Sequence, residues 1–430
     1  MAKPKLGLIP SAQGSKFYSV LPSSGVGDFD FTRSGSATRI NSQGLIETVG
    51  NGVSRLNYPM IDGKVVGCPH HILEPTRTNL ITYSEDFSDS SWTKGASTIT
   101  SNATISPYGS LNADKLVENT SIANHRVYKI ISIVNLQKYT QSIFVKKGER
   151  RYLQIAFGSK FSSVQWANFD LEDGIVTLDN GGVNAKIENF GNGWYRCSAT
   201  STATVTSSEA FYINMINNPN SGRFESYQGD GTSGIYIWGF EVEQGSYPTS
   251  YIPTNGSTVT RSAETANGSG DASTFNDSEG VLMAEIKGLS SSDTSNRRLG
   301  ITKNGTYEGL RLQMDNGTIG ATLYDGTTNQ YSKVVNIDNS IFNKVAFKYK
   351  ANDFALWING IEYHPQSSGI TFVDGTLDDL SFDYVGGNDL YSNTKQVQYF
   401  DSALTDSELE TLTSWVSFSD MANGQLYTIE

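Results

Sequence analysis

The chain has 430 residues, which is too long for one comfortable hydrophobic core and predicts two domains plus an additional segment. Charged residues make up only 18% of the chain and hydrophobic residues 37%, while 42 residues are glycine. This mixture excludes long amphipathic helices and favours short strands joined by polar turns. The formal net charge of −12 would repel a phosphate backbone, so we expect no nucleic-acid partner.

The chain has no run of about 18 apolar residues, so we expect no membrane insertion. Its opening, MAKPKLGLIPSAQGSKF, lacks the apolar core of a signal peptide. We therefore expect synthesis in a cytoplasm and transport to the outside by a carrier, of which a virus particle is one example. Cys68 and Cys197 are too few for a disulfide framework or a cysteine zinc site.

Residues 1–78 form the first predicted region, which is rich in glycine and has irregular apolar spacing. Its clearest strand-and-turn stretch is DFDFTRSGSATRINSQGLIETV, and prolines gather near its end at Pro59, Pro69 and Pro75. Two interpretations stay open at this point. The region is either a small compact domain or an extended segment that packs on its neighbours and anchors the chain.

Residues 79–263 show short strands separated by turn signals, the pattern of an all-β sandwich. The predicted strands lie in YTQSIFVKKGE, RRYLQIAFG, VQWANFDLEDG, GWYRCSATST, EAFYINMI and SGIYIWGFEVEQG. Asp173-Gly174 is a tight-turn sequence that closes one of them. Residues 264–278, within ETANGSGDASTFNDSEG, then predict a flexible linker.

Residues 279–430 contain a second strand series, with hairpin turns at Asn316-Gly317 and Asn359-Gly360. Near the end, Thr405 and Glu408 form a capping box, and Leu409, Leu412 and Val416 follow at helical spacing. The predicted fold class is therefore all-β. It consists of two antiparallel β-sandwiches, an irregular N-terminal segment and one short C-terminal helix.

Several phrases resemble known families. The run SGSATRINSQGLIETV, followed by RLNYP and ILEPTRTNLITYSEDFSDSSW, resembles a module common in bacteriophage tail and other virion proteins. In that family the module leads into a carbohydrate-binding-module-like jelly roll, and the likeness extends over roughly residues 28–264. Residues 279–430 are similar to concanavalin A-like, laminin G-like lectin sandwiches, through FALWINGIEY and VQYFDSALTDSELETL.

These resemblances imply a phage virion structural protein, as a tail fibre, a head fibre or a decoration protein. Such a protein would present lectin-like domains for adhesion to host-surface glycans. Its location would be the surface of the phage particle, after synthesis in the bacterial cytoplasm. Its partners would be other virion proteins and the host glycan. Because phage fibres and spikes are commonly trimers, we also expect a homo-oligomer, most simply a trimer.

A sugar site needs exposed aromatic rings beside hydrogen-bonding side chains. The period-2 alternation of strands places such residues opposite the apolar positions of three strands in the first sandwich. The candidates for a shallow glycan-binding platform are Tyr152, Gln154, Trp166, Asn168, Tyr212 and Asn214. Two alternatives compete with this interpretation: an interface within an oligomer, or a face covered by the N-terminal segment.

Two further sites are predicted less directly. Trp357 lies on the opposite strand face from its apolar neighbours and is a candidate second exposed ring for glycan binding. No cofactor is required, but a structural calcium ion is a candidate, because Glu85, Asp86 and Glu241 lie on segments that begin and end the first sandwich. The alternative is that these acids are solvated surface residues.

Two other functions stay open. A glycan-degrading phage spike would need a catalytic pair of carboxyl groups. The sequence contains no E-x-D-x-x-E strand motif, no G-x-S-x-G elbow and no β-helix repeat. We therefore predict no enzymatic activity. The other alternative is a purely architectural capsid decoration that binds no ligand.

Overall fold

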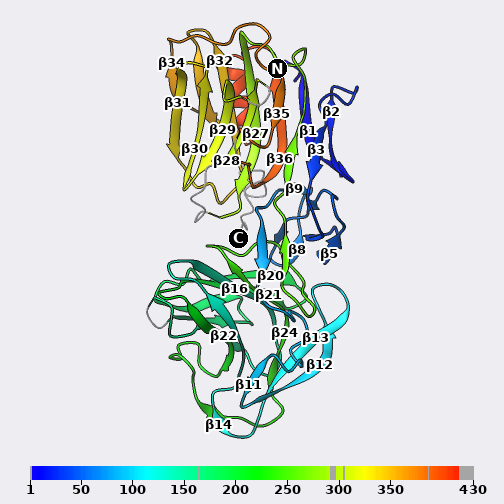
Figure 1. Cartoon of the computed structure of the whole chain (residues 1–430), viewed down its shortest axis with the longest axis vertical. Coiled ribbons are helices and arrows are strands. Elements are labelled where there is room, and N and C mark those ends of the chain that lie inside the picture. The colour runs from blue at the N-terminus through cyan, green and yellow to red at the C-terminus, as the bar shows by residue number, and fades with distance from the viewer. Residues whose placement is uncertain (1, 163–164, 291–296, 304–305, 386, 416–430) are drawn as a thin grey trace.

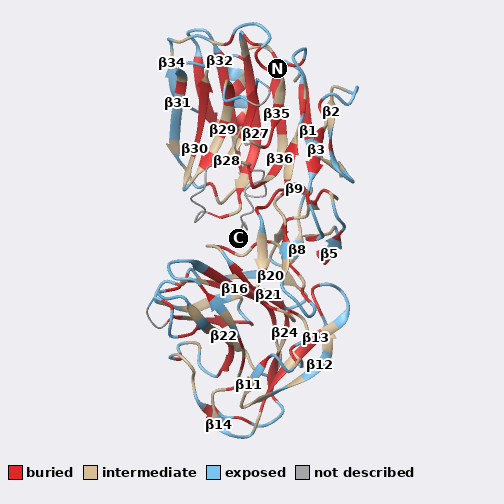
Figure 2. Cartoon of the chain, in the orientation of Figure 1, coloured by how far each residue is buried: buried red, intermediate tan, exposed pale blue. Residues whose placement is uncertain are grey.

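A computed structural model describes residues 2–162, 165–290, 297–303, 306–385 and 387–415 (Figure 1). The described chain forms two β-rich lobes, one above the other along the long axis of the view. Antiparallel sheets and one short helix make up its regular structure, so the predicted all-β class is confirmed. Buried residues concentrate on the strands of both lobes (Figure 2). In these residues no helix is long and apolar enough to cross a membrane.

The lower lobe is a sandwich of two six-stranded antiparallel sheets. The first has the order β11 (Thr93–Gly95), β15 (Arg126–Ile133), β22 (Ser207–Ile216), β17 (Tyr152–Phe157), β18 (Trp166–Asp170) and β19 (Ile175–Asn180). The second has the order β12 (Ser97–Ile105), β13 (Leu111–Glu118), β24 (Gly234–Gln244), β16 (Lys138–Lys147), β21 (Trp194–Thr202) and β20 (Lys186–Gly191). Alternate residues of both sheets, such as Ile155 and Ile143, fill the core between them.

The upper lobe is the second sandwich. Its larger sheet has the order β26 (Thr265–Asn267), β3 (Phe29–Thr32), β2 (Lys16–Leu21), β1 (Leu6–Gln13), β36 (Ser392–Phe400), β27 (Glu279–Gly288), β32 (Asn343–Lys350), β33 (Phe354–Ile358) and β34 (Ile361–Gln366). Two short strands, β9 (His70–Ile72) and β6 (Leu56–Asn57), join beside β36. The facing sheet has the order β31 (Asn329–Asn336), β30 (Thr318–Tyr324), β29 (Gly309–Asp315), β28 (Arg297–Thr302) and β35 (Asp379–Ser381).

The first 78 residues pack on their neighbours, as one of the two open interpretations expected, but they do so partly as strands of the large sheet. Strand β1 pairs with β36, with Leu6 opposite Tyr399 and Leu8 opposite Val397. Leu6 and Leu8 lie in the core of the C-terminal sandwich, so the two ends of the chain build one domain around the inserted lower lobe. Local sequence cannot predict this arrangement, because the pairing strands lie near opposite ends of the chain.

The expected linker at residues 264–278 is likewise ordered into the fold. Its strand β26 pairs with β3, with Ala266 opposite Phe31, and closes the edge of the large sheet. Glu264, the first residue of the expected linker, is fully buried. The glycine- and serine-rich composition that indicated flexibility reflects tight turns between these short pairings.

Four short two-stranded pairings of the described chain add to these sheets, and the last of them lies at the far end of the lower lobe (Figure 1). They are β4 (Ala37–Ile40) with β5 (Ile46–Val49), β7 (Met60–Ile61) with β8 (Lys64–Val65), β10 (Arg77–Asn79) with β25 (Val259–Arg261), and β14 (Ile122–Ala123) with β23 (Tyr227–Gln228). The first three lie in or beside the N-terminal segment, which therefore contacts both sandwiches rather than standing apart.

The C-terminal helix α1 (Asp406–Thr413) begins as predicted. The Glu408 backbone N–H donates to Thr405 Oγ1 at 3.3 Å, and the Thr405 N–H donates to Glu408 Oε2 at 3.1 Å. Leu409 is buried against the large sheet, whereas Val416 lies outside the described residues. The helix also explains Trp357, which was predicted to be exposed: it is 6% exposed and packs in the apolar cluster that includes Leu409. That prediction was wrong, because strand alternation identifies the face and not what covers it.

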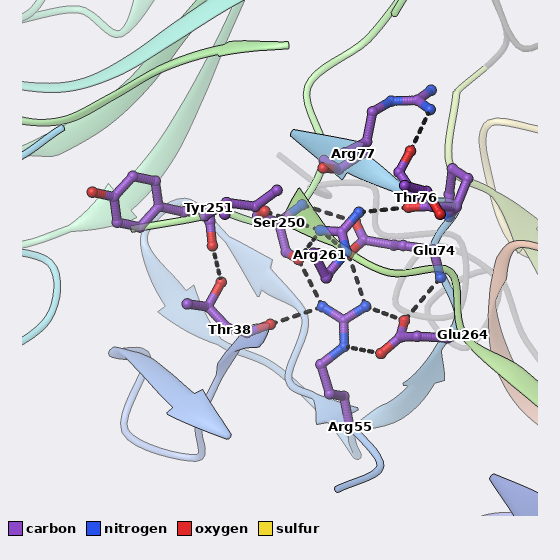
Figure 3. Close-up of polar contacts among 12 residues, drawn as sticks. Thr38, Arg55, Glu74, Thr76, Arg77, Ser250, Tyr251, Arg261 and Glu264 are labelled. Atoms are coloured by element: carbon purple, nitrogen blue, oxygen red, sulfur yellow. Dashed lines mark hydrogen bonds and ion pairs between the residues drawn. The ribbon is translucent and has the colours of Figure 1, made fainter. Parts of the chain in front are cut away.

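A buried ion cluster joins the N-terminal segment to the exit of the first sandwich (Figure 3). Arg55 donates from Nε to Glu264 Oε1 at 2.8 Å and from Nη2 to Glu74 Oε2 at 2.8 Å. Arg33 donates to Glu264 at 2.7 Å, and Arg261 pairs with Glu74 at 2.9 Å. Burial alone would raise the pKa of Glu74, but Arg261 and Arg55 outweigh it and lower the pKa to about 2. The Glu74 carboxylate therefore stays charged, and both carboxylates lie among three buried arginines.

Candidate functional site

The outer face of the first six-stranded sheet carries the side chains that alternation placed there, but half of them are covered. Gln154, Asn168 and Asn214 are fully buried. Asn168 Nδ2 donates to the carbonyl oxygens of Pro219 and Ser221 at 3.0 and 2.8 Å. The loop that follows β22 therefore folds back over its own sheet.

Gln154 fastens the same loop at a second point. Its Nε2 donates to the Gly222 carbonyl at 3.1 Å, and its Oε1 accepts from the Phe224 N–H at 2.8 Å. Because buried backbone groups of a loop need partners, these amides act as its internal anchors. The expectation that the three amides are open to a sugar is therefore corrected. The sequence could not reveal this, since a ten-residue polar loop gives no periodic signal.

Three aromatic candidates remain partly exposed, and they divide into two places. Tyr212 pairs with Ala156, which in turn pairs with Trp166, so Tyr212 and Trp166 lie on one row across three strands with a small residue between them. Tyr128 on β15 pairs with Tyr212 and extends this row, with ring centroids 4.9 Å apart. Tyr152 lies four residues away along β17 and stacks with Arg151 instead. The structure thus brings Tyr212 and Trp166 together and separates Tyr152 from them.

Two arginines cap the aromatic row. The guanidinium carbon of Arg126 lies 5.2 Å from the Tyr212 ring centroid and 4.8 Å from that of Phe224. The guanidinium carbon of Arg223, from the covering loop, lies 3.8 Å from the Phe224 centroid and 5.7 Å from that of Tyr212. Tyr128, Tyr212, Phe224, Arg126 and Arg223 form a compact group that we call the arginine–aromatic cluster. Cation–π contacts of this kind fix the planes of the guanidinium groups.

Neither arginine of the cluster has a carboxylate partner among the described residues. Arg223 donates one hydrogen bond, from Nη2 to the Phe157 carbonyl at 2.6 Å. The Arg126 side chain makes none in the same part of the chain, and its Nε is buried. Burial lowers the pKa of Arg223, and burial also raises the pKa of Tyr212. Two half-buried guanidinium groups thus lie beside aromatic rings without an ion pair to any described carboxylate, although the charge of Glu209 acts on Arg223.

Sequence analysis missed Arg126, Tyr128, Arg223 and Phe224. Alternation in RVYKII would have placed Arg126 and Tyr128 on the outer face of β15, so those two carried a usable signal. Arg223 and Phe224 belong to the loop, and their position depends on its anchoring by Gln154 and Asn168. Chemically, the cluster offers ring faces for sugar C–H surfaces and guanidinium forks for a carboxylate.

The three candidate calcium ligands do not meet at one point. Glu85 accepts hydrogen bonds from Tyr251 Oη and Asn112 Nδ2, both at 3.0 Å. Asp86 accepts from the backbone of the turn that follows it. Glu241 is buried and accepts from Arg196 at 2.9 Å. Across the described ranges, no group of three His, Cys, Asp or Glu side chains is placed to hold a metal ion.

Glu241 and Glu243 are the carboxyl groups that most resemble an acid–base pair. Burial raises the pKa of both, and the Glu243 charge raises that of Glu241 further. Both side chains are fully enclosed, with Glu241 held by Arg196 and Glu243 by Thr249. Neither carboxyl group is therefore open to solvent.

Comparisons with known proteins find solved structures that are similar to parts of this chain at low sequence identity. No protein-family model matches the chain, and no curated protein matches it. Among solved structures, the Ruminococcus gnavus IT-sialidase CBM40 bound to alpha2,3 sialyllactose is 21% identical over 34% of this chain and 88% of its own, with a TM-score of 0.29. Mouse laminin alpha1 chain domains LG4-5 are 9% identical over 66% of this chain and 90% of their own, with a TM-score of 0.22. Neither is similar enough in sequence to identify a shared family.

Proposed function

We propose that this chain is a non-enzymatic structural protein of a bacteriophage particle, and that its first sandwich binds acidic glycans on the host surface. The observation that carries the binding part is the arginine–aromatic cluster, in which Arg126 and Arg223 lie over rings and form no ion pair with a carboxylate of the described residues. The virion part rests on the resemblance of residues 28–264 to a module of phage tail proteins.

The acidic character of the glycan follows from charge. The protein has a net charge of −12, yet it holds two arginines against one ring on this face without an ion pair to any described carboxylate. A carboxylate-bearing sugar would supply the missing anion through paired N–H···O bonds and would place its ring on Tyr212 or Tyr128. A neutral sugar would leave both guanidinium groups without a charged partner, so acidic glycans should be preferred.

The test replaces each arginine with an uncharged side chain of similar length. We expect Arg126→Gln and Arg223→Gln each to weaken retention on an acidic glycan by about 10- to 100-fold, the effect of losing one charged hydrogen-bond partner. Glycan-array binding and adsorption to host cells are the measurements. The matched control is Arg151→Gln, because Arg151 lies in the same sheet region but already pairs with Asp170 at 2.6 Å. Unchanged binding by both cluster variants would contradict the proposed glycan site.

Oligomerisation is part of the proposal. Single sugar sites bind weakly, and identical copies around one axis raise apparent affinity by ~10² or more when their spacing matches the host surface. We propose a homotrimer, which native mass measurement of the purified chain would test. A monomer at all concentrations used for adsorption would overturn this part and leave the glycan site standing.

Two alternatives are decided by direct measurements. If the purified chain releases oligosaccharides from host capsule, its function is glycan degradation and not adhesion alone. A chain that binds no glycan on an array, but occupies an ordered position on the phage particle in electron microscopy, would be a purely architectural protein. The absence of the chain from purified phage particles would overturn the virion assignment.

A further inference from the structure

A cleft lies where the N-terminal segment, the first sandwich and the C-terminal sandwich meet. It consists of two adjoining hollows with volumes of about 440 and 220 Å³. Both hollows are lined by Asn57 of the N-terminal segment, Glu188 of β20 and Lys287 of β27, so all three parts contribute to one space. Hollows of a few hundred Å³ at domain interfaces are common binding places for small ligands.

The walls of this cleft are held in place from both ends. At the larger hollow, the β7–β8 turn touches the β20–β21 turn so closely that a Cβ on Gly191 would lie 2.5 Å from the Gly63 carbonyl oxygen. The smaller hollow is bordered by Glu74 and Ser250, which belong to the buried ion cluster (Figure 3). A cavity with fixed walls loses little entropy when a ligand enters, which favours binding.

The lining carries hydrogen-bonding groups of both kinds. Amides come from Asn57, Asn189 and Asn393. The carboxylates of Asp62, Asp173 and Glu188 add acceptors, and Asp173 also pairs with Arg151 at 2.6 Å. Lys287 adds a donor: its ammonium group makes no hydrogen bond or ion pair within the described residues and lies 6.0 Å from the Phe342 ring centroid.

Aromatic rings and charges of both signs line the cleft. Tyr58, Phe190 and Tyr195 line the larger hollow. Burial lowers the pKa of Lys287, while Glu188 acts in the opposite direction. A ligand with a net charge would meet both signs in this space, whereas a sugar hydroxyl can donate to Glu188 and accept from Lys287. The cleft therefore offers aromatic rings, amide side chains and charges of both signs, a lining that suits an uncharged sugar.

We infer that this interdomain cleft is a second saccharide site, which takes an uncharged hexose or N-acetylhexosamine unit between the two sandwiches. This site shares no residue with the arginine–aromatic cluster, and its ligand is uncharged whereas the ligand of the cluster is acidic. It holds whether or not the cluster binds acidic glycans.

The first test measures access to Lys287 in the full chain. The chain is labelled with an amine-reactive acetylating reagent in the presence and absence of glucose, galactose, N-acetylglucosamine or N-acetylgalactosamine, and each lysine is quantified by mass spectrometry. At a sugar concentration ten times its Kd, labelling of Lys287 should slow about tenfold for at least one of the four sugars. Lys333, an exposed residue of β31, is the internal control and should not change. Equal labelling of Lys287 with all four sugars would overturn the inference.

The second test blocks the cleft. Glu188→Trp adds a large ring at an exposed position that lines both hollows, and it should abolish the protection of Lys287. Lys186→Trp adds the same ring two residues earlier on the same strand face, outside both linings, and should preserve it. Protection that persists in Glu188→Trp, or protection by galacturonate but by none of the four neutral sugars, would overturn the inference.

The two sites are distinguished by combining variants. In a chain with Arg126→Gln and Arg223→Gln, adsorption to acidic glycans should fall while sugar protection of Lys287 stays unchanged. If the proposed function fails, the cluster variants bind like the unmodified chain and the labelling result still stands by itself. Loss of Lys287 protection in the cluster variants would show that the cleft is not an independent site, and would overturn the inference.

Discussion

Side chains on one face of the first sandwich have different roles according to what lies above them. Gln154 and Asn168 occupy the positions that alternation assigns to the outer face, and both donate hydrogen bonds that anchor the loop of residues 217–226. That loop in turn delivers Arg223 and Phe224 to the arginine–aromatic cluster. Gln154 and Asn168, which were predicted to contact a sugar, therefore position the loop that carries Arg223 and Phe224 instead.

A substitution at Asn168 tests this positioning role. Asn168→Ala removes three hydrogen bonds, two to the Pro219 and Ser221 carbonyl oxygens and one from Gln154 Nε2, so the free energy of unfolding should fall by about 1–3 kcal/mol. Hydrogen exchange of the loop amides should accelerate, and glycan binding should weaken with it. Denaturant unfolding and exchange mass spectrometry are the measurements. Asn220→Ala, an exposed neighbour in the same loop, should stay within about 0.5 kcal/mol of the unmodified chain.

Individual strands show how far apart in sequence the stabilising contacts lie. β1 and β2 complete the large sheet of the C-terminal sandwich, and Leu8 is fully buried in its core while the next residue, Ile9, is 47% exposed. Leu8→Ala should therefore cost about 2–5 kcal/mol of unfolding free energy, and it should lower amide protection in β27 and β36. Ile9→Ala is the control with the same chemistry, and it should change the unfolding free energy by less than about 0.5 kcal/mol. Normal protection of β36 in Leu8→Ala would mean that the N-terminal segment folds separately.

Strand β9 makes the same sandwich sensitive to acid. Burial lowers the pKa of His71 to about 4, and burial together with Lys287 and Lys395 lowers that of His70 to about 3. In the unfolded chain both take up a proton near pH 6.5, so the unfolded state binds more protons below that value. Stability should fall as the pH drops from 7 to 5, by about 2 kcal/mol for each histidine.

Urea unfolding across this pH range checks the prediction. His71→Gln should flatten the pH dependence of the unfolding free energy, whereas His364→Gln, at an exposed position of β34, should leave the slope unchanged. A chain whose stability is the same at pH 7 and pH 5 would contradict the buried, neutral state of the two histidines.

At the scale of the whole molecule, the ion cluster decides how the two sandwiches are joined. Glu264 accepts from both Arg33 and Arg55, and all three side chains are fully enclosed. Glu264→Gln leaves two buried guanidinium groups short of a counter-charge and should destabilise the junction by about 3–5 kcal/mol. We expect one thermal transition to split into two, as measured by calorimetry. The exposed pair of Lys16 and Asp30 is the control, and Asp30→Asn should leave the transition intact.

Acid should act on the same junction. The Glu74 pKa of about 2 lies below its unfolded value near 4.5, so the stability that Glu74 contributes is complete above pH 4.5 and is lost as the pH falls toward 2.

A Glu264→Gln chain with a single unchanged thermal transition would show that the lobes are coupled through contacts other than the ion cluster.

Sequence by itself determined the all-β class, the strand faces of the first sandwich, the capped C-terminal helix and the candidate status of Tyr212 and Trp166. These are properties of neighbouring residues, because alternation, turn composition and capping all act over a few positions. Only the tertiary structure decided that β1 pairs with β36, that residues 264–278 are ordered, that α1 covers Trp357 and that a loop buries Gln154 and places Arg223 beside Arg126. Each of these depends on contacts between segments far apart in the chain, and no local pattern records which distant segment will cover a given face.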